Sequence, residues 1–175
     1  MTPPAGMVDA FVAIGSNIEP RRNVPAALRI LKRQVQVVAV STLYRTAPIG
    51  DSSQPAFVNG VWKLRTNRPA RTLKYGLLRP IEDRLGRDRS GDSCAPRTID
   101  LDVVLHGQSV CQQADLVIPS PDLDRPFVAL PLLELAPELT LPDGRPLRRL
   151  CEGMDRSALS PEREMTQKLR EILSE

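Results

Sequence analysis

The sequence has few cysteines and a single histidine, and these shortages exclude several kinds of site. Its three cysteines, Cys94, Cys111 and Cys151, lack CxxC spacing, which argues against a disulfide framework and against a zinc site. Free thiols are typical of a reducing compartment. His106 is the only histidine. Because it has no visible partner in the sequence, we interpret it as a strand-end residue and not as a ligand.

Long apolar runs, a secretory signal and glycine-rich phosphate loops are also missing. No apolar run approaches the ~20 residues that a membrane-spanning helix requires. Met1 to Gly6 lacks the basic start and apolar stretch of a secretory signal. No P-loop or GxGxxG pattern occurs, so an ATP site would not be built on either motif. We therefore expect a cytoplasmic protein without a membrane partner.

The composition fits one globular domain. The 175 residues are 41% hydrophobic and 26% charged, which allows a sizeable buried core. The net charge of +3 suits nucleic acid, but equally a nucleotide or another polyphosphate. Because aromatic residues are few and no groove-binding motif is present, a nucleic-acid-binding module is the weaker hypothesis and we expect no nucleic-acid partner.

The hydrophobic pattern predicts elements in the order β-α-β-β-α-β, followed by smaller pieces. Strands are expected at residues 10–14, 37–45, 57–64 and 97–105, and helices at residues 25–35 and 67–85. Asn23 could cap the first helix, with Pro25 in its first turn, and Pro80 should kink the second. The smaller pieces are a hairpin at 108–118, a helix at 127–135, a strand at 139–141 and a helix at 166–173 that starts near Ser160. This order favours an α+β sandwich with a mostly antiparallel sheet.

Asp100 and Asp102 lie two residues apart on the clearest predicted strand, so their carboxylates share one face, with backbones roughly 6 to 7 Å apart. The opposite face carries the apolar residues Ile99, Leu101, Val103 and Leu105. Two like charges on one face disfavour ionisation unless a cation lies between them. Mg²⁺ suits such a pair, because it binds one or two carboxylates together with substrate phosphates. The alternative is a solvated strand face with two ordinary surface acids.

Arginines gather around this acid pair. Arg84, Arg87 and Arg89 follow the second helix, and Arg97 precedes the acids. Metals flanked by arginines suit in-line phosphoryl transfer, because catalysis there is mainly positioning and charge stabilisation. A solvated helix end is the alternative for the arginines alone, but the combination with the acids favours a catalytic site.

Phe57 and Phe127 each follow a proline-containing loop, where functional sites tend to gather. Two phenyl faces could hold a flat heterocycle by stacking. Asn59 shares a strand face with Phe57, and its amide both donates and accepts hydrogen bonds. The alternatives are two core phenylalanines and a half-exposed polar residue.

Five blocks of the sequence, in order and spacing, resemble the 6-hydroxymethyl-7,8-dihydropterin pyrophosphokinase family. The signature is the run from Ala95 to Val104, APRTIDLDVV. The other blocks are residues 13–17, residues 44–50 with 54–59, residues 81–87, and residues 125–137. The resemblance extends over roughly Phe11 to Leu150, nearly the whole chain.

The resemblance implies a ferredoxin-like βαββαβ core with helices on the faces of the sheet. It implies a folate-synthesis enzyme that transfers pyrophosphate from ATP to the hydroxymethyl group of the pterin and releases AMP. The catalytic domain would span residues 8–154, followed by a C-terminal helical tail at 155–175. We expect a monomer whose partners are small-molecule substrates.

The resemblance also implies roles for individual residues. Asp100 and Asp102 would bind two Mg²⁺ ions, and Arg87 and Arg97 would be catalytic. The pterin-binding residues would be Thr46, Ala47, Ile49, Phe57, Asn59 and Phe127. The ATP-binding residues would be Arg79, Glu82, Arg89, Arg97, Thr98, Val103 and Arg125.

The chain departs from the family pattern around the nucleotide. Ser93 and Cys94 replace a charged and an aromatic residue, and Ser120 with Pro121 replaces a pair that begins with histidine. Arg79 matches a position that can be glutamine, and the loop before Phe127 is slightly short. These changes predict altered ATP binding with the metal site retained. They also leave open a non-catalytic pterin- or nucleotide-binding paralogue.

Overall fold

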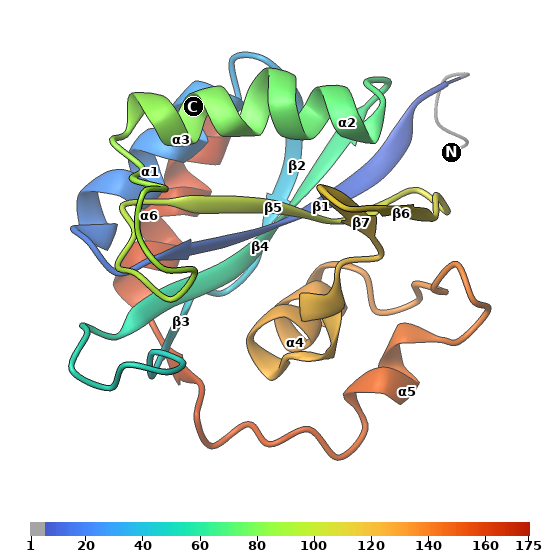
Figure 1. Cartoon of the computed structure of the whole chain (residues 1–175). Helices are drawn as coiled ribbons and strands as arrows, with labels where there is room; N and C mark the ends of the chain where they lie inside the picture. The colour runs from blue at the N-terminus through green and yellow to red at the C-terminus, as the bar shows by residue number, and fades with distance from the viewer. Residues whose placement is uncertain (1–5) are drawn as a thin grey trace.

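A twisted β-sheet with helices against both faces forms the protein in the computed structural model, which describes residues 6–175 (Figure 1). The expectation that Met1 to Gly6 carries no secretory signal falls mainly on residues 1–5, which lie outside the described residues. Within residues 6–175, no helix is both long and apolar enough to cross a membrane.

The main sheet has the order β5-β1-β4-β3-β8, with β2 beside β4, and every pairing is antiparallel. Its strands are β1 (Val8–Ser16), β2 (Gln36–Val40), β3 (Tyr44–Thr46), β4 (Phe57–Thr66), β5 (Asp100–His106) and β8 (Ser160–Pro161). A separate hairpin consists of β6 (Cys111–Gln113) and β7 (Leu116–Ile118). The predicted α+β class, the mostly antiparallel sheet and the hairpin are confirmed.

The helices divide between the two faces of this sheet. One face carries α1 (Pro20–Leu31), α2 (Ala70–Leu73), the π-helical turn η1 (Lys74–Leu78), α3 (Arg79–Arg84) and α6 (Arg163–Ser174). The other carries the 3₁₀ turn η2 (Pro121–Asp124), α4 (Pro126–Leu135) and α5 (Leu147–Cys151). The helix predicted at 127–135 is confirmed as α4, whereas α5 was not predicted. Each face buries its own apolar core, and the uncovered part of the second face is left for a site.

The start of the first helix was predicted wrongly. α1 begins at Pro20, so Asn23 lies inside the helix, where its Nδ2 donates to the carbonyl of Ile18 at 2.7 Å. Pro25 is also inside the helix. Its fixed φ suits helical geometry, although it removes one backbone hydrogen bond. Pro20 at the first turn therefore determined where the helix begins.

The strand predicted at 37–45 is divided into β2 and β3. At the break the Ser41 N–H donates to the Val61 carbonyl, and the Ser41 hydroxyl accepts from the Val61 N–H, each at 2.9 Å. A side chain thus replaces one backbone partner in the ladder. Both parts still pair with β4.

Pro80 produces the predicted irregularity in the helix that precedes the signature. The chain winds as a π-helix over Lys74–Leu78 and returns to an α-helix at Arg79. A wider turn accommodates the missing N–H of the proline. The helix therefore continues past Pro80 to Arg84.

The two faces of β5 alternate as predicted only as far as Val103. The register with β1 shifts between Phe11 and Val12, because Phe11 pairs with Leu105 and Val12 pairs with Val103. This bulge turns Leu105 toward the same core as Val104, so its predicted place beside Val103 was wrong. An extra residue in one strand reverses the alternation that follows it.

The C-terminal segment differs from its prediction in two ways. Ser160 belongs to β8, and the helix begins later, at Arg163. The strand predicted at 139–141 is only an isolated bridge between Thr140 and Pro146. Helix α6 packs on α1 and β2 through Met165, Leu169 and Ile172, which belong to the first core.

Leu169→Ala should lower the free energy of unfolding by about 2–5 kcal/mol, because the fully buried side chain leaves a cavity in the shared core. Urea unfolding measures the change. Lys168→Ala, an exposed change on the same helix, should stay within about 0.5 kcal/mol of the wild type. Equal stability of the two variants would mean that α6 is not part of the cooperative fold.

Candidate active site

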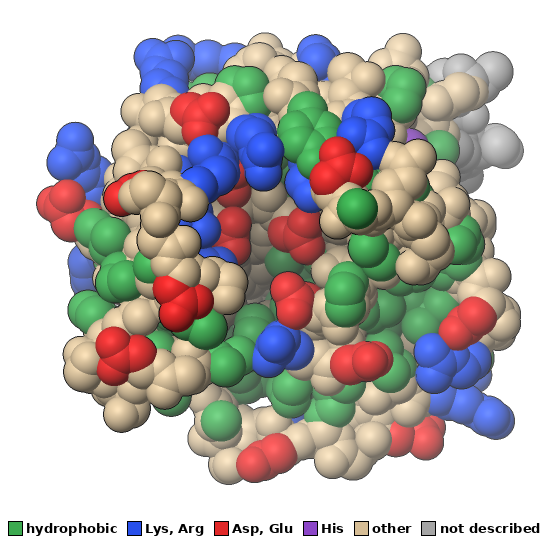
Figure 2. Space-filling model, in the orientation of Figure 1, with side chains coloured by type: hydrophobic (Ala, Val, Ile, Leu, Met, Phe, Trp, Pro, Cys, Tyr) green, Lys and Arg blue, Asp and Glu red, His purple; other side chains and the backbone are tan. Residues whose placement is uncertain are grey.

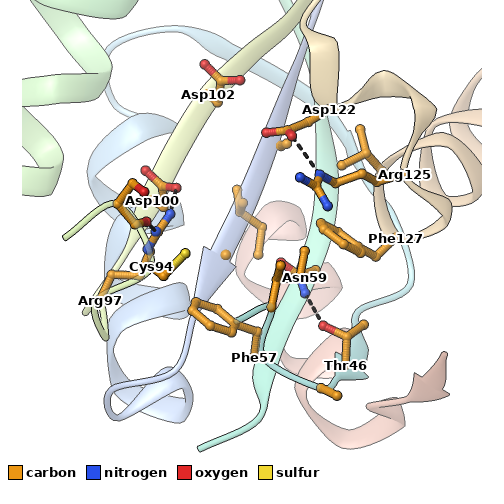
Figure 3. A pocket seen from close by; sticks show the side chains of 17 residues that line it. Thr46, Phe57, Asn59, Cys94, Arg97, Asp100, Asp102, Asp122, Arg125 and Phe127 are labelled. Carbon is orange, nitrogen blue, oxygen red and sulfur yellow. Dashed lines mark hydrogen bonds and ion pairs between the residues drawn. The ribbon is translucent and has the colours of Figure 1, made fainter. Parts of the chain in front are cut away.

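A cavity of about 330 Å³ opens on the second face of the sheet beside α4. Acidic side chains lie inside the hollow and basic side chains surround part of its rim (Figure 2). Its walls come from the strands β1, β3, β4 and β5, the loops before β4 and β5, and the start of α4 (Figure 3). Ten of the predicted site residues line it: Thr46, Ala47, Ile49, Phe57, Asn59, Arg97, Asp100, Asp102, Arg125 and Phe127.

The central strand β1 explains why there is room for a ligand. Gly15 of β1 stands between Asn59 of β4 and Asp100 of β5 in the strand register. A Cβ atom at Gly15 would lie only 3.0 Å from Asn59 Oδ1. The side chain next in line on this face is the small Ala13. The floor between the amide and the acids is therefore open.

The acid pair shows the electrostatic conflict expected from its spacing. Burial raises the pKa of Asp102 from 3.8 to about 6, and the charge of Asp100 adds to this rise, while a hydrogen bond from Ser120 opposes it. The Ser120 hydroxyl donates to Asp102 Oδ2 at 3.0 Å. Arg97 Nη1 lies 2.5 Å from Asp100 Oδ2. A cation at this end of the cavity would relieve the repulsion.

Aromatic and amide groups lie at the opposite end. Asn59 Nδ2 donates to Thr46 Oγ1 at 2.6 Å, and both residues are buried. Phe57 and Phe127 lie on either side of Asn59 in the view of Figure 3. The Arg97 guanidinium stands over the Phe57 ring at 5.7 Å. The Arg125 guanidinium stands over the Phe127 ring at 5.9 Å, and both rings and the Asn59 amide line the cavity.

Glu82, Arg87 and Arg89 do not line the cavity. Burial raises the pKa of Glu82 to about 7, and the charge of Asp100 adds to the rise. Glu82 accepts hydrogen bonds from the Leu101 N–H at 2.7 Å and from Arg89 Nη2 at 2.6 Å. Burial lowers the pKa of Arg87, whose buried Nε has no hydrogen-bond partner among residues 6–175.

Arg97 and Arg125 are the two predicted ATP-binding residues that line the cavity, whereas Arg79, Val103 and Thr98 do not. Arg79 is exposed and lies 5.0 Å over the Tyr75 ring. Val103 is buried in the first core, so only its backbone could meet a ligand. The Thr98 carbonyl accepts from Ser16 Oγ at 2.6 Å, and the Thr98 hydroxyl oxygen is buried without a partner in the part of the chain that the structure describes.

Sequence reasoning missed several residues that organise the cavity. Asn17 links its two loops: Nδ2 donates to Gln54 Oε1 at 3.1 Å, and Oδ1 accepts from the Arg97 N–H at 2.8 Å. Asp122 lines the cavity and accepts from Arg125 Nε at 2.8 Å. Asn17 stood in a block of the family resemblance, and this was the only signal that could have indicated it. Ser120, noted only as a departure near the nucleotide, holds Asp102 instead.

His106 has a partner that its sequence did not show. Its Nε2 lies 2.8 Å from the carbonyl oxygen of Arg68, at the end of β5. The histidine does not line the cavity, in keeping with the interpretation as a strand-end residue.

Asp102→Asn should become more stable relative to the wild type as pH rises. Urea unfolding of the wild type and the variant in a chelating buffer measures the difference. An acid whose pKa is raised by folding favours the folded state at low pH and disfavours it as pH passes from its ordinary value to the raised one. The stability difference should therefore shift in favour of the asparagine variant by on the order of 1–2 kcal/mol between pH 4 and pH 7. A difference that does not depend on pH would contradict the burial of this carboxylate.

Known proteins resemble the chain over most of its length. Residues 11–137 match the family model of the 7,8-dihydro-6-hydroxymethylpterin-pyrophosphokinase. The 2-amino-4-hydroxy-6-hydroxymethyldihydropteridine pyrophosphokinase of Pseudomonas aeruginosa is 43% identical over 155 residues, which cover 83% of this chain and 94% of the relative. Its namesake in Haemophilus influenzae is 36% identical, over 83% of this chain and 92% of the relative. The chain therefore belongs to the 7,8-dihydro-6-hydroxymethylpterin-pyrophosphokinase family.

Proposed function

We propose that this protein transfers pyrophosphate from ATP to the hydroxymethyl group of 6-hydroxymethyl-7,8-dihydropterin in folate synthesis. The observation that carries the proposal is one cavity with an acid pair and Arg97 at one end, and two phenyl rings with a buried amide at the other. The family membership gives the chemistry of both ends. A polar flat acceptor and a polyphosphate donor would meet between them.

The pterin would lie between Phe57 and Phe127, because a flat heterocycle stacks favourably on phenyl faces. The Asn59 amide, which already donates to Thr46, would form hydrogen bonds with the polar edge of the ring. The backbone at Thr46 and Ala47 would supply further hydrogen bonds, and Ile49 would cover the ring from the loop. Burial of these polar groups favours a ligand that satisfies them all, since an unpaired buried group is costly.

Asp100 and Asp102 would hold two Mg²⁺ ions. Among residues 6–175, no group of three or more His, Cys, Asp and Glu side chains is arranged to hold a metal ion, so phosphate oxygens and water would complete each shell, as is usual for Mg²⁺. The raised pKa of Asp102 fits this role, because a bound cation offsets the cost of ionisation. Bound Mg²⁺ would supply charge neutralisation for the phosphates.

Arg87 and Arg97 would stabilise the charge on the transferred group. The pterin hydroxyl oxygen would form a bond to the β-phosphorus while the bond from that phosphorus to the bridging oxygen of the α-phosphate breaks, so AMP leaves and the hydroxyl loses its proton. Arg97 lies beside Asp100 and over the Phe57 ring, so it would stand between the two proposed substrates. The ATP-binding residues would be Arg79, Glu82, Arg89, Arg97, Thr98, the backbone of Val103, and Arg125.

The core would be ferredoxin-like. The elements β1, α1, β2 with β3, β4, α2 to α3, and β5 follow the βαββαβ order, and the strand order β5-β1-β4-β2 places the first and third strands at the centre. We also propose that residues 8–154 form the catalytic domain and residues 155–175 an added helical segment. The protein would act as a cytoplasmic monomer on small molecules.

The purified protein, given ATP, Mg²⁺ and the reduced pterin alcohol, should release AMP and not ADP, because the attack is on the β-phosphorus. Chromatography of the nucleotides measures the product. Omitting the pterin should abolish AMP release and so controls for hydrolysis. Persistent ADP formation would contradict the proposed reaction.

Asp100→Ala and Asp102→Ala should each lower kcat by roughly 100-fold or more, because a metal clamp supplies several kcal/mol of transition-state stabilisation. Asp143→Ala, which removes an exposed turn acid outside the cavity, is the matched control and should retain activity. Circular dichroism should show that all three variants are folded. Wild-type activity in either site variant would remove the proposed metal site.

A further inference from the structure

The C-terminal segment from Ser160 to Ser174 lies beyond the residues matched by the family model. The proposed chemistry gives it no role, yet it meets the sheet beside the cavity. β8 pairs with β3, with Arg45 opposite Ser160. β3 ends at Thr46, which forms part of the cavity wall. The segment is therefore one strand away from the proposed pterin site.

Short polar contacts tie both backbone groups of Leu43 to this segment. The Leu43 N–H donates to the Thr166 hydroxyl at 2.9 Å, and the Leu43 carbonyl accepts from the Glu162 N–H at 2.8 Å. The Thr166 hydroxyl in turn donates to the Glu162 carbonyl at 2.7 Å. Arg45 Nε donates to Glu162 Oε1 at 2.6 Å. Thr166 is buried, so its hydroxyl has no access to alternative partners in bulk water.

The position of Leu43 affects the proposed pterin site through two connections. It is fully buried, and a Cβ at Gly60 would lie only 2.6 Å from Leu43 Cδ2, so Leu43 packs tightly on the residue after Asn59. It also lies one residue before β3, which has only three residues and would be marginal without partners on both edges. A shift of Leu43 would therefore disturb both Asn59 and Thr46.

Helix α6 also reaches the helix that carries Phe127. Glu134 of α4 accepts from the Thr42 N–H and hydroxyl, each at 3.0 Å. Arg170 of α6 approaches the same carboxylate at 3.4 Å. Residues 42–45 are thus held between α4 and the C-terminal segment, and both β3 and α4 contribute side chains to the cavity.

We propose that Thr166 is a positioning residue for pterin binding. Its hydroxyl holds Leu43 so that Thr46 and Asn59 keep their hydrogen-bonded arrangement. Thr166 itself does not line the cavity, so it acts only through this chain of contacts. The inference rests on the proposed function, because it takes the surroundings of Thr46 and Asn59 as the pterin site.

Thr166→Val tests the inference, because valine keeps the shape of threonine and removes the hydroxyl. The Kd for the reduced pterin alcohol, measured by calorimetry, should rise roughly 3- to 10-fold, because binding must then restore the arrangement of Thr46 and Asn59 at a cost of up to about one buried hydrogen bond. The Kd for ATP with Mg²⁺ should not change. Thr166→Ser restores the hydroxyl and should recover most of the pterin affinity. Glu164→Gln, an exposed change on the same helix, is the matched control.

A purely structural role would lower the free energy of unfolding of Thr166→Val and leave its pterin Kd at the wild-type value; that result would overturn the inference. If Thr166→Val does not fold, Arg45→Gln provides a second test, because it breaks the exposed ion pair between Arg45 and Glu162. This variant should also bind pterin more weakly. Unchanged binding would again overturn the inference. A wild-type protein that binds no pterin would remove the proposed function and this inference together. If the wild type, Thr166→Val and Arg45→Gln all bind pterin equally well, the inference fails while the proposed function stands.

Discussion

The repulsion between Asp100 and Asp102 is the constraint on which the rest of the site depends. Burial raises the pKa of Asp102 to about 6, and the charge of Asp100 adds to the rise, so two carboxylates on this partly buried strand face cannot both ionise easily. Two contacts reduce the cost of ionisation: the Ser120 hydroxyl donates to Asp102, and the Arg97 guanidinium pairs with Asp100. Under the proposed function, Mg²⁺ ions and substrate phosphates would complete the balance of charge around the two acids.

The order of the strands fixes the size of the site. β1 separates the acids of β5 from the amide of β4, so the two ends of the cavity are about 9 to 10 Å apart, or two strand spacings. Gly15 and Ala13, the small residues of β1, line the gap, and Ile14, which also lines it, belongs to the first core. Where α4 covers the same face, larger apolar side chains such as Phe11 and Val61 fill the space instead. One sheet face thus serves as core at one end and as cavity at the other.

The contacts that support the cavity come from segments far apart in the chain. Asn17 joins the loop before β4 to the loop before β5, and Glu82 binds the edge of β5 at the Leu101 N–H. Thr166 holds the residues before β3 from more than a hundred positions away. Polar side chains that satisfy buried backbone groups are costly to lose, so these residues tie stability of the fold to the shape of the site.

The sequence by itself determined the α+β class, the antiparallel pattern and the shared face of Asp100 and Asp102, because strand alternation is a local property with a period of two. Motif blocks identified the family and indicated Phe57, Asn59 and Phe127. Only the tertiary structure decided the bulge that turns Leu105, the Ser120 contact to Asp102 and the linking role of Asn17. Each of these depends on a partner distant in sequence, and residue type and spacing carry no information about which distant groups will meet.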